Sequence, residues 1–204
     1  MAVMSVPSIR FRPLAESDLP NLVEWFAEPE IARWWNQPAE IDSVRAKYLP
    51  RIEQREPTQM WIAEIDEEAG GLLQSYLHGD YNEHDQCVGI AEAVGIDYLI
   101  AGLHRGRGRG RLVLHAFADW TLAHYPDASN CVATPAQANE ASWRALEHAG
   151  FSRVGECQPP DEPLAYVYVR GREEAQLQAR RDPRSADSFV ERRDDTSSAG
   201  FKLT

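Results

Sequence analysis

The chain has 204 residues, a length that suits one folded domain with a sizeable hydrophobic core. Its net charge of −11 argues against nucleic acid as a partner, and no apolar run is long enough to predict a signal peptide or a membrane span. The three widely spaced cysteines (Cys87, Cys131 and Cys157) and the six histidines show no metal-ligand spacing. We therefore expect a cytoplasmic protein with reduced thiols and no metal.

Apolar periodicity predicts strands and helices that alternate within one α/β (α+β) domain, residues 1–171. In chain order we expect a strand at 9–14, a helix that begins at 16–18, a helix at 41–53, strands at 60–65 and 72–77 joined by a turn at 66–71, a polar loop at 78–88, a strand at 94–101, a helix at 108–124, a strand at 130–133, a helix at 138–148 and strands at 151–156 and 165–169. This order predicts a twisted, mixed, mainly antiparallel sheet flanked by helices. Residues 172–204 are charged and poor in aliphatic side chains, so we expect a helix at about 172–181 and then a partly disordered tail.

The most specific motif is Arg105-Gly106-Arg107-Gly108-Arg109-Gly110, between the expected strand 94–101 and the expected helix 108–124. Glycines let the backbone come close to a ligand, and the free N–H groups at a helix start bind anions. The interleaved arginines add positive charge, so the motif predicts a phosphate site, with pyrophosphate as the obvious ligand. A flexible Arg/Gly tail that binds nucleic acid fits less well, because the run lies between two apolar elements. A P-loop would need a Lys-Ser or Lys-Thr pair, and the dinucleotide fingerprint has another glycine spacing.

This Arg-x-x-Gly-x-Gly run after a strand resembles the signature of the GCN5-related N-acetyltransferase (GNAT) superfamily. A second segment, Ala138-Asn139-Glu140 through Ala149-Gly150-Phe151, resembles the family's Asn-led helix that ends in Ala-Gly-Phe. The resemblance implies the GNAT fold and acetyl-coenzyme A as co-substrate, with its pyrophosphate on the turn at 105–110. It also implies that the pantetheine arm pairs with backbone groups of Leu99, Ile100 and Ala101, and that Asn139 contacts the cofactor. A helix N-cap is the alternative role for Asn139, and both roles are compatible.

Five shorter segments resemble the aminoglycoside 6′-N-acetyltransferases in matching order. They are Trp34-Trp35, Tyr48-Leu49-Pro50, Gln74-Ser75-Tyr76, Gly95-Ile96-Asp97 and Pro160-Asp161-Glu162-Pro163. The resemblance implies acetyl transfer to a primary amine of an aminoglycoside-like polycation. Related enzymes that acylate a lysine-type amine during siderophore assembly share this framework, so a siderophore hydroxylysine or a peptide amine is the alternative acceptor. A weakly catalytic acyl-CoA-binding module is a further alternative.

The charge distribution favours a cationic substrate. No lysine or arginine occurs between Glu56 and His104, and the same span holds ten acidic residues: Glu56, Glu64, Asp66, Glu67, Glu68, Asp80, Glu83, Asp85, Glu92 and Asp97. A negative field attracts cations, although an acidic surface can also serve solubility alone. Beside an acetyl-CoA motif, we interpret this span as an acidic wall for a polyamine.

Acetyl transfer to an amine needs a group that removes a proton from the ammonium. Asp97 is the leading candidate, because it lies on the strand before the phosphate turn, where the resemblance places a substrate-facing carboxylate. Strand alternation predicts Asp97 and Leu99 on one face and Ile96 and Tyr98 on the other. The alternatives are a solvated carboxylate or one that only anchors an ammonium. Glu92, near the start of the strand, is the reserve base.

The expected substrate-binding residues combine aromatic and acidic side chains: Trp35, Tyr76, Asp80, Asp97 and Asp161. Trp35 offers an aromatic face to a cation or a sugar ring, whereas we expect Trp34 to be the core member of the pair. Asp80 and Asp161 would pair with ammonium groups. The sequence leaves open whether the protein is a monomer or a homodimer.

Two positions depart from the family pattern. Leu146 stands where many relatives carry a tyrosine that protonates the leaving thiolate, and Thr134 stands where the aminoglycoside enzymes have a substrate-binding aspartate. The first departure leaves the acid step without an obvious donor, although a thiol's pKa near 8.5 permits unassisted departure of the thiolate. The second affects aminoglycoside specificity.

Overall fold

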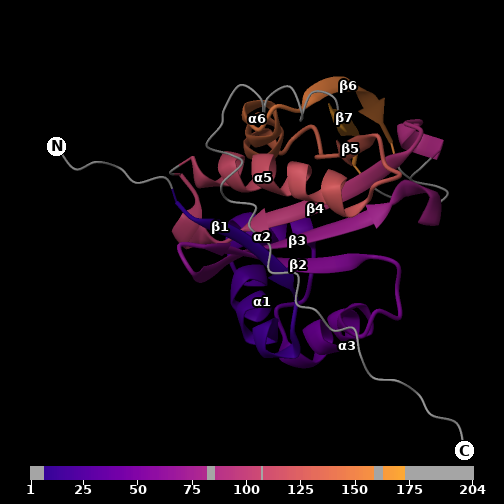
Figure 1. Ribbon diagram of the computed structural model, residues 1–204. Coiled ribbons are helices and arrows are strands. Elements are labelled where there is room, and N and C mark those ends of the chain that lie inside the picture. Colours follow the sequence, from indigo (N-terminus) through magenta and orange to yellow (C-terminus); the bar gives the residue numbers. More distant parts are fainter. Residues whose placement is uncertain (1–6, 82–85, 107, 159–162, 173–204) are drawn as a thin grey trace, which may run out of the picture.

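The computed structural model describes residues 7–81, 86–106, 108–158 and 163–172 (Figure 1). Arg107, Asp161 and the expected helix at 172–181, apart from Arg172, lie outside these described residues. The elements in chain order are β1 (Ile9–Pro13), η1 (Glu16–Asp18), α1 (Leu19–Phe26), α2 (Pro29–Trp35), α3 (Ile41–Ile52), β2 (Gln59–Ile65), β3 (Glu68–Leu77), η2 (His78–Asp80), β4 (Ala93–Ile100), η3 (Gly102–His104), α5 (Arg109–His124), β5 (Asn130–Ala133), α6 (Glu140–His148), β6 (Ser152–Cys157) and β7 (Ala165–Gly171). Within the described ranges, no helix has the length and apolar character to cross a membrane.

The strands form one seven-stranded sheet in the order β1-β2-β3-β4-β5-β7-β6. All neighbouring pairs are antiparallel except β4 and β5, which are parallel, so the expected mixed, mainly antiparallel sheet is confirmed. The register between β4 and β5 covers only Ala93–Gly95 against Asn130–Val132. Since β4 continues to Ile100, its second half runs beyond this pairing, and the sheet opens between the two strands.

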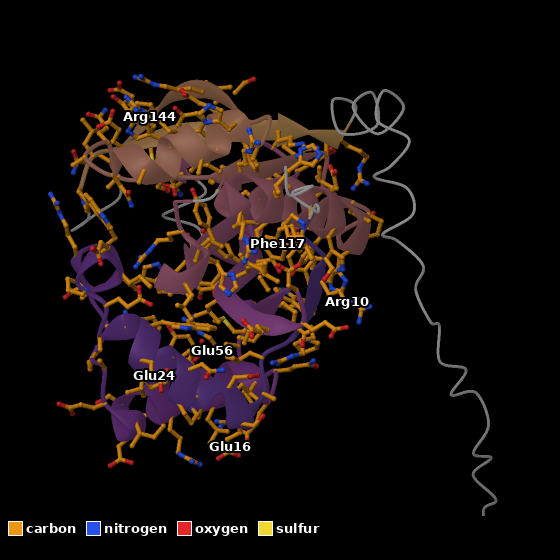
Figure 2. All side chains as sticks on the ribbon, turned by 90° about the vertical axis from the view of Figure 1, so that its left-hand side faces the viewer. Arg10, Glu16, Glu24, Glu56, Phe117 and Arg144 are labelled. Atoms are coloured by element: carbon orange, nitrogen blue, oxygen red, sulfur yellow. The ribbon has the colours of Figure 1, made fainter. Side chains whose placement is uncertain are left out.

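Two hydrophobic cores lie on opposite faces of the sheet (Figure 1). The first core packs α1, α2 and α3 against the sheet and includes Leu99. The second core packs α5 and α6 against the other face and includes Ile96 and the fully buried Phe117, which is labelled in the interior in Figure 2. Asp97 is an odd-numbered neighbour of Leu99 on the same strand, so its side chain points to the face of α1–α3. The predicted alternation along β4 is therefore confirmed for Leu99 and Ile96.

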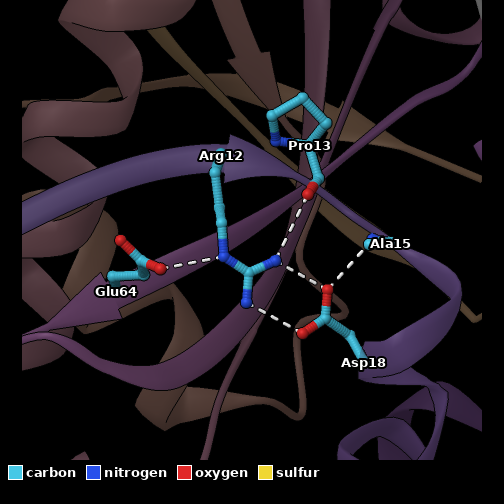
Figure 3. A network of polar contacts seen from close by, with 5 residues as sticks. All are labelled: Arg12, Pro13, Ala15, Asp18 and Glu64. Carbon is cyan, nitrogen blue, oxygen red and sulfur yellow. Dashed lines mark hydrogen bonds and ion pairs between the residues drawn. The ribbon is translucent and has the colours of Figure 1, made fainter.

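A polar network fixes the N-terminal strand against the next element (Figure 3). Arg12 on β1 donates from Nε to Glu64 at 2.8 Å and from Nη1 and Nη2 to the two carboxylate oxygens of Asp18 at 2.6 and 2.8 Å. Asp18 also accepts from the backbone N–H of Ala15 at 2.9 Å. Burial alone would raise the pKa of Asp18, but the bonds from Arg12 and Ala15 outweigh it and leave the pKa lowered. The network ties β1, β2 and the start of α1 together.

Two local expectations were wrong. Helix α2 was not predicted, because it has only seven residues and no apolar repeat of sufficient length; it ends where Asn36 adopts a left-handed conformation with φ of 43°. The expected turn at 66–71 is shorter, since Asp66 and Glu67 both have positive φ and β3 already begins at Glu68. A two-residue turn of this kind joins antiparallel strands directly, and the glycines that follow it belong to the strand.

Candidate active site

A cavity of about 670 Å³ opens where β4 and β5 diverge. It is bounded by α2 and α3 on one side and by α6 and the segment after β5 on the other, with β3 and β4 between them. Its polar and aromatic lining residues include Trp34, Trp35, Lys47, Arg51, Gln74, Tyr76, Asp97, Tyr98, Thr134, Asn139 and Ser142. Segments that lie far apart in the sequence thus meet at the opening of the sheet.

Asp97 is the one carboxylate among the described lining residues of the cavity. It is half-buried on β4, directly across from Gln74 of β3, whose side-chain oxygen accepts from Arg51 at 2.7 Å. Burial raises the pKa of Tyr48 and of Tyr98, and in each case the negative charge of Asp97 raises it further. The carboxylate therefore lies close to both phenols, where it could accept a proton from an amine in the cavity.

Glu92, the reserve base, lies away from this group. It is exposed just before β4, with φ of 49°, and its carboxylate accepts from the Ser129 hydroxyl at 2.6 Å. It is not one of the described lining residues. Asp97 is thus the better placed of the two carboxylates.

The half of β4 that lies beyond the pairing with β5 has backbone groups that can bind a ligand. Not all of the three predicted residues, Leu99, Ile100 and Ala101, contribute such groups. The N–H of Ala101 donates to Gly70 at 2.9 Å and its carbonyl accepts from His104 at 2.9 Å, so both groups are used within the protein. Because backbone groups alternate between the two edges of a strand, those of Leu99 face β3 with those of Ala101, whereas those of Ile100 and Tyr98 face the opening toward β5. Of the three predicted residues, Ile100 therefore has backbone groups that face the opening, and so does Tyr98, which the sequence analysis did not name.

The glycine-rich turn has the backbone geometry of an anion site. Gly106 and Gly108 have φ of 74° and 69°, values that favour glycine, and Gly108 is the N-cap of the 16-residue helix α5. Gly110 lies in the first turn of that helix. The N–H groups of the first turn and the helix dipole favour a phosphate at this end.

The two described arginines of this turn, Arg105 and Arg109, are already paired with carboxylates, which the sequence did not predict. Arg105 bonds to Glu28 and lies 3.7 Å from Glu30, both near the start of α2. Arg109 donates to Asp66 at 3.0 Å and contacts the His104 ring nitrogen at 2.8 Å. Their charge is partly neutralised within the protein, so the backbone and the dipole carry more of the expected phosphate binding than the side chains do.

Asn139 has the N-cap role that was expected as one alternative, and it also lies in the cavity wall. It is the N-cap of α6, where its side-chain oxygen accepts from the backbone N–H of Ser142 at 3.2 Å. It also lines the cavity. The cap orients a side chain that could contact a cofactor in the opening of the sheet.

The expected substrate-binding residues are only partly brought together. Trp35 and Tyr76 line the cavity with Asp97, whereas Asp80 is exposed in η2 and is not one of the described lining residues. Trp35 also packs against the first core, with its ring 5.8 Å from that of Phe26. Trp34, which was expected in the core, instead lines the cavity and carries the Arg33 guanidinium 4.8 Å from its ring centre.

Lys47 and Arg51, one turn apart on α3, are cationic lining residues that the sequence analysis missed. Burial lowers the pKa of Lys47, and the neighbouring charge of Arg51 lowers it further, against the attraction of Glu56. The expected acidic wall is not found among the described lining residues. Glu56 instead pairs with Arg51 at 2.8 Å, and other acids of the span pair elsewhere, such as Glu64 with Arg12.

The two departures from the family pattern lie in different surroundings. Leu146 is fully buried in the second core, whereas Thr134 lines the cavity.

Among the described residues, no group of three or more histidine, cysteine, aspartate or glutamate side chains could hold a metal ion.

Comparison with known proteins agrees with this geometry. The acetyltransferase (GNAT) domain family matches residues 15–159. The aminoglycoside N(6′)-acetyltransferases type 1 of Klebsiella pneumoniae and Serratia marcescens are each 31% identical to the chain over 169 residues, which is 78% of this chain and 82% of theirs. Aminoglycoside acetyltransferase AAC(6′)-Ib, solved in complex with coenzyme A and kanamycin, superimposes with a TM-score of 0.72 at 29% identity and covers 85% of this chain and 99% of its own. A spermidine N-acetyltransferase from Vibrio cholerae, solved with CoA and spermine, shares the fold with a TM-score of 0.64 at 15% identity, covering 83% of this chain and 98% of its own.

The family match covers more than half of the chain, and the mixed, mainly antiparallel sheet, the glycine turn at the start of α5 and the Asn-capped α6 are the features that the sequence resemblance implied. The chain therefore belongs to the GNAT superfamily of N-acetyltransferases, and the aminoglycoside N(6′)-acetyltransferases are among its relatives.

Proposed function

We propose that this enzyme transfers the acetyl group of acetyl-CoA to a primary amine of an aminoglycoside-type substrate, with Asp97 as the base. The observation that carries the proposal is the position of Asp97, a single described carboxylate in a cavity at the opening between β4 and β5. The identity of the two 31% identical relatives as aminoglycoside N(6′)-acetyltransferases and the coenzyme A and kanamycin bound to AAC(6′)-Ib support it.

The residues divide the work between two sides of the cavity. The amides at the start of α5 would hold the pyrophosphate, and the backbone of Ile100 would pair with the pantetheine arm in the opening of the sheet. The thioester then lies near Asp97 and Tyr98. On the other side, Trp34, Trp35 and Tyr76 present aromatic surface to a cationic amine or a sugar ring.

Chemically, Asp97 takes a proton from the ammonium, directly or through a water molecule, and the neutral amine attacks the thioester carbonyl carbon. The nitrogen loses its second proton as the amide bond forms, the carbon–sulfur bond breaks, and coenzyme A leaves as the thiol with one proton while the other is released to solvent.

A second acceptor class is favoured by Lys47 and Arg51. These cations line the same cavity as Asp97, and an acceptor that carries both an amine and a carboxylate would match charges of both signs. A lysine-type amine is such an acceptor, whereas a polycation would meet Lys47 with like charge.

A thiol-release assay with acetyl-CoA separates the two classes when kanamycin, cadaverine and lysine are compared. Cadaverine and lysine have the same amine, so their ratio isolates the carboxylate. We expect turnover of kanamycin and cadaverine; a strong preference for lysine that Lys47→Gln abolishes and Lys47→Arg retains would instead identify the second class. If none of the tested amines gives thiol release, the result would favour an acyl-CoA-binding module and contradict the proposed function.

A further inference from the structure

Tyr98 and Ser142 form a pair of hydroxyl groups in the wall of the cavity. Tyr98 follows Asp97 on β4, and its hydroxyl lies 2.6 Å from the Ser142 hydroxyl and donates to the Ser142 carbonyl at 3.1 Å. Ser142 stands in the first turn of α6, directly after the Asn139 cap. Both residues line the cavity. The pair thus bridges the opening of the sheet from β4 to α6.

The two neighbours on β4 serve opposite faces of the strand. Asp97 belongs to the face of α1–α3, together with Gln74 across the ladder, whereas the Tyr98 ring packs against the second core beside α6. An acceptor amine near Asp97 would therefore attack the acetyl carbon from one side of the strand. The leaving sulfur would depart on the other side, near Tyr98. This arrangement separates a proton acceptor from a proton donor by one residue.

Other hydroxyl groups in the cavity are less suited to the leaving group. Tyr76 lies across from Gly95, on the same face of the strand as Asp97. The Tyr81 hydroxyl is hydrogen-bonded to the Thr58 hydroxyl. Leu146 on α6 carries no proton to donate and is fully buried. Tyr98 is the phenol in the described lining that reaches the α6 side of the opening.

We propose that the Tyr98 hydroxyl donates its proton to the sulfur of coenzyme A as the carbon–sulfur bond breaks. The proposal rests on the proposed acetyl transfer. After the first ammonium proton has passed through Asp97 to solvent, the neutral nitrogen forms the new carbon–nitrogen bond and gives a second proton to Asp97, the sulfur takes the phenolic proton, and coenzyme A leaves as the thiol. The phenolate then regains a proton from Asp97 through the Ser142 hydroxyl or cavity water, so that both groups return to their starting states.

The electrostatics keep the phenol of Tyr98 in its protonated form. Burial raises the pKa of Tyr98, and the charge of Asp97 raises it further, against the Ser142 bond that lowers it. The phenol therefore carries a proton before the reaction begins. The same apolar surroundings disfavour a free thiolate and so increase the sulfur's demand for a proton or a hydrogen bond.

The first test compares Tyr98→Phe with Tyr125→Phe. Tyr125 is a matched control, since its half-buried hydroxyl lies 3.1 Å from Ser75 and it is not one of the described lining residues. We expect Tyr98→Phe to lower kcat with acetyl-CoA about 100-fold, without raising KM for the amine, and Tyr125→Phe to retain wild-type kcat. With 4-nitrophenyl acetate as donor, whose leaving group departs as an anion, the loss in Tyr98→Phe should shrink to a few-fold. An equal loss with both donors, or no loss with acetyl-CoA, would overturn the proposal.

The second test needs no turnover. Calorimetric affinities for coenzyme A and desulfo-coenzyme A are compared as pH rises through the thiol's pKa, about 8.5. We expect wild type to bind coenzyme A about tenfold more tightly as the thiolate forms, with no such change for desulfo-coenzyme A, because a phenol donates a strong hydrogen bond to a charged acceptor. Tyr98→Phe should lose this gain. A wild type that shows no gain, or a variant that keeps it, would overturn the role of Tyr98, whereas absent turnover with every amine would contradict only the proposed function.

Discussion

Gly95 on β4 and Tyr76 on β3 lie directly opposite each other, and the tyrosine ring fills the space that a side chain at position 95 would need. A Cβ atom at Gly95 would lie 2.5 Å from Cε2 of the ring and 3.0 Å from the His78 ring nitrogen. Gly95 is also the last residue of β4 that pairs with β5. The glycine therefore positions an aromatic wall of the cavity at the point where the sheet opens.

Replacing Gly95 should consequently damage acceptor binding rather than cofactor binding. We expect Gly95→Ala to displace the Tyr76 ring and to raise KM for the amine about tenfold, while the affinity for coenzyme A stays near that of wild type. Gly155→Ala on β6 is the control, because a Cβ there meets nothing within 4 Å. Steady-state kinetics with titration calorimetry provide the measurement. An unchanged KM in Gly95→Ala would show that the Tyr76 ring plays no part in binding the acceptor.

The turn before α5 should respond to any side chain at its N-cap. Gly108 has φ of 69°, so Gly108→Val forces a β-branched residue into a strained conformation and displaces the amides that we propose hold the pyrophosphate. We expect the affinity for coenzyme A to fall at least about tenfold. Gly89→Val carries the same backbone strain, at φ of 64°, where a Cβ meets nothing within 4 Å. Equal affinities in the two variants would place the phosphate elsewhere.

The Arg12–Asp18 network predicts a pH-dependent contribution to stability (Figure 3). The pKa of Asp18 is lowered in the folded state, so its stabilisation is present above the unfolded value of about 3.9 and is lost as pH falls through the folded pKa. We expect Asp18→Asn to reduce the free energy of unfolding by about 2 kcal/mol at neutral pH.

Urea unfolding of both proteins from neutral pH down to about pH 3 checks this expectation, and the difference should shrink below about pH 4. Exposed Asp127 supplies the control, since Asp127→Asn should change stability by less than about 0.5 kcal/mol. A difference between wild type and Asp18→Asn that stays constant over the whole range would contradict the ionic origin of the stabilisation.

Long elements with a clear apolar period were predictable from the sequence. Helix α5 and strand β4 lie where the residues around the glycine turn indicated, because their burial follows a local repeat. The seven-residue α2 was not predictable, since tertiary packing of Trp35 and Ile31 holds it rather than a long repeat. The early start of β3 was hidden by acidic and glycine residues that usually indicate turns.

The site was predictable where one segment carries it and not where several segments converge. Asp97 and the glycine turn belong to one strand–turn–helix unit. Arg105, by contrast, pairs with Glu28, which is 77 positions away, and Lys47 enters the cavity from a helix whose role no local motif indicates. Contacts between distant segments depend on the tertiary fold, which the pattern of single elements does not contain.

The most direct test of the account is the turnover of Asp97→Asn with acetyl-CoA and an accepted amine, with coenzyme A affinity measured in parallel. The substitution is nearly isosteric, so packing and cofactor binding should be preserved while thiol release falls by about 100-fold or more. Glu92→Gln, which changes the exposed carboxylate bonded to Ser129, should remain near wild type. Near-normal turnover in Asp97→Asn would contradict its assignment as the base and leave it as an anchoring residue.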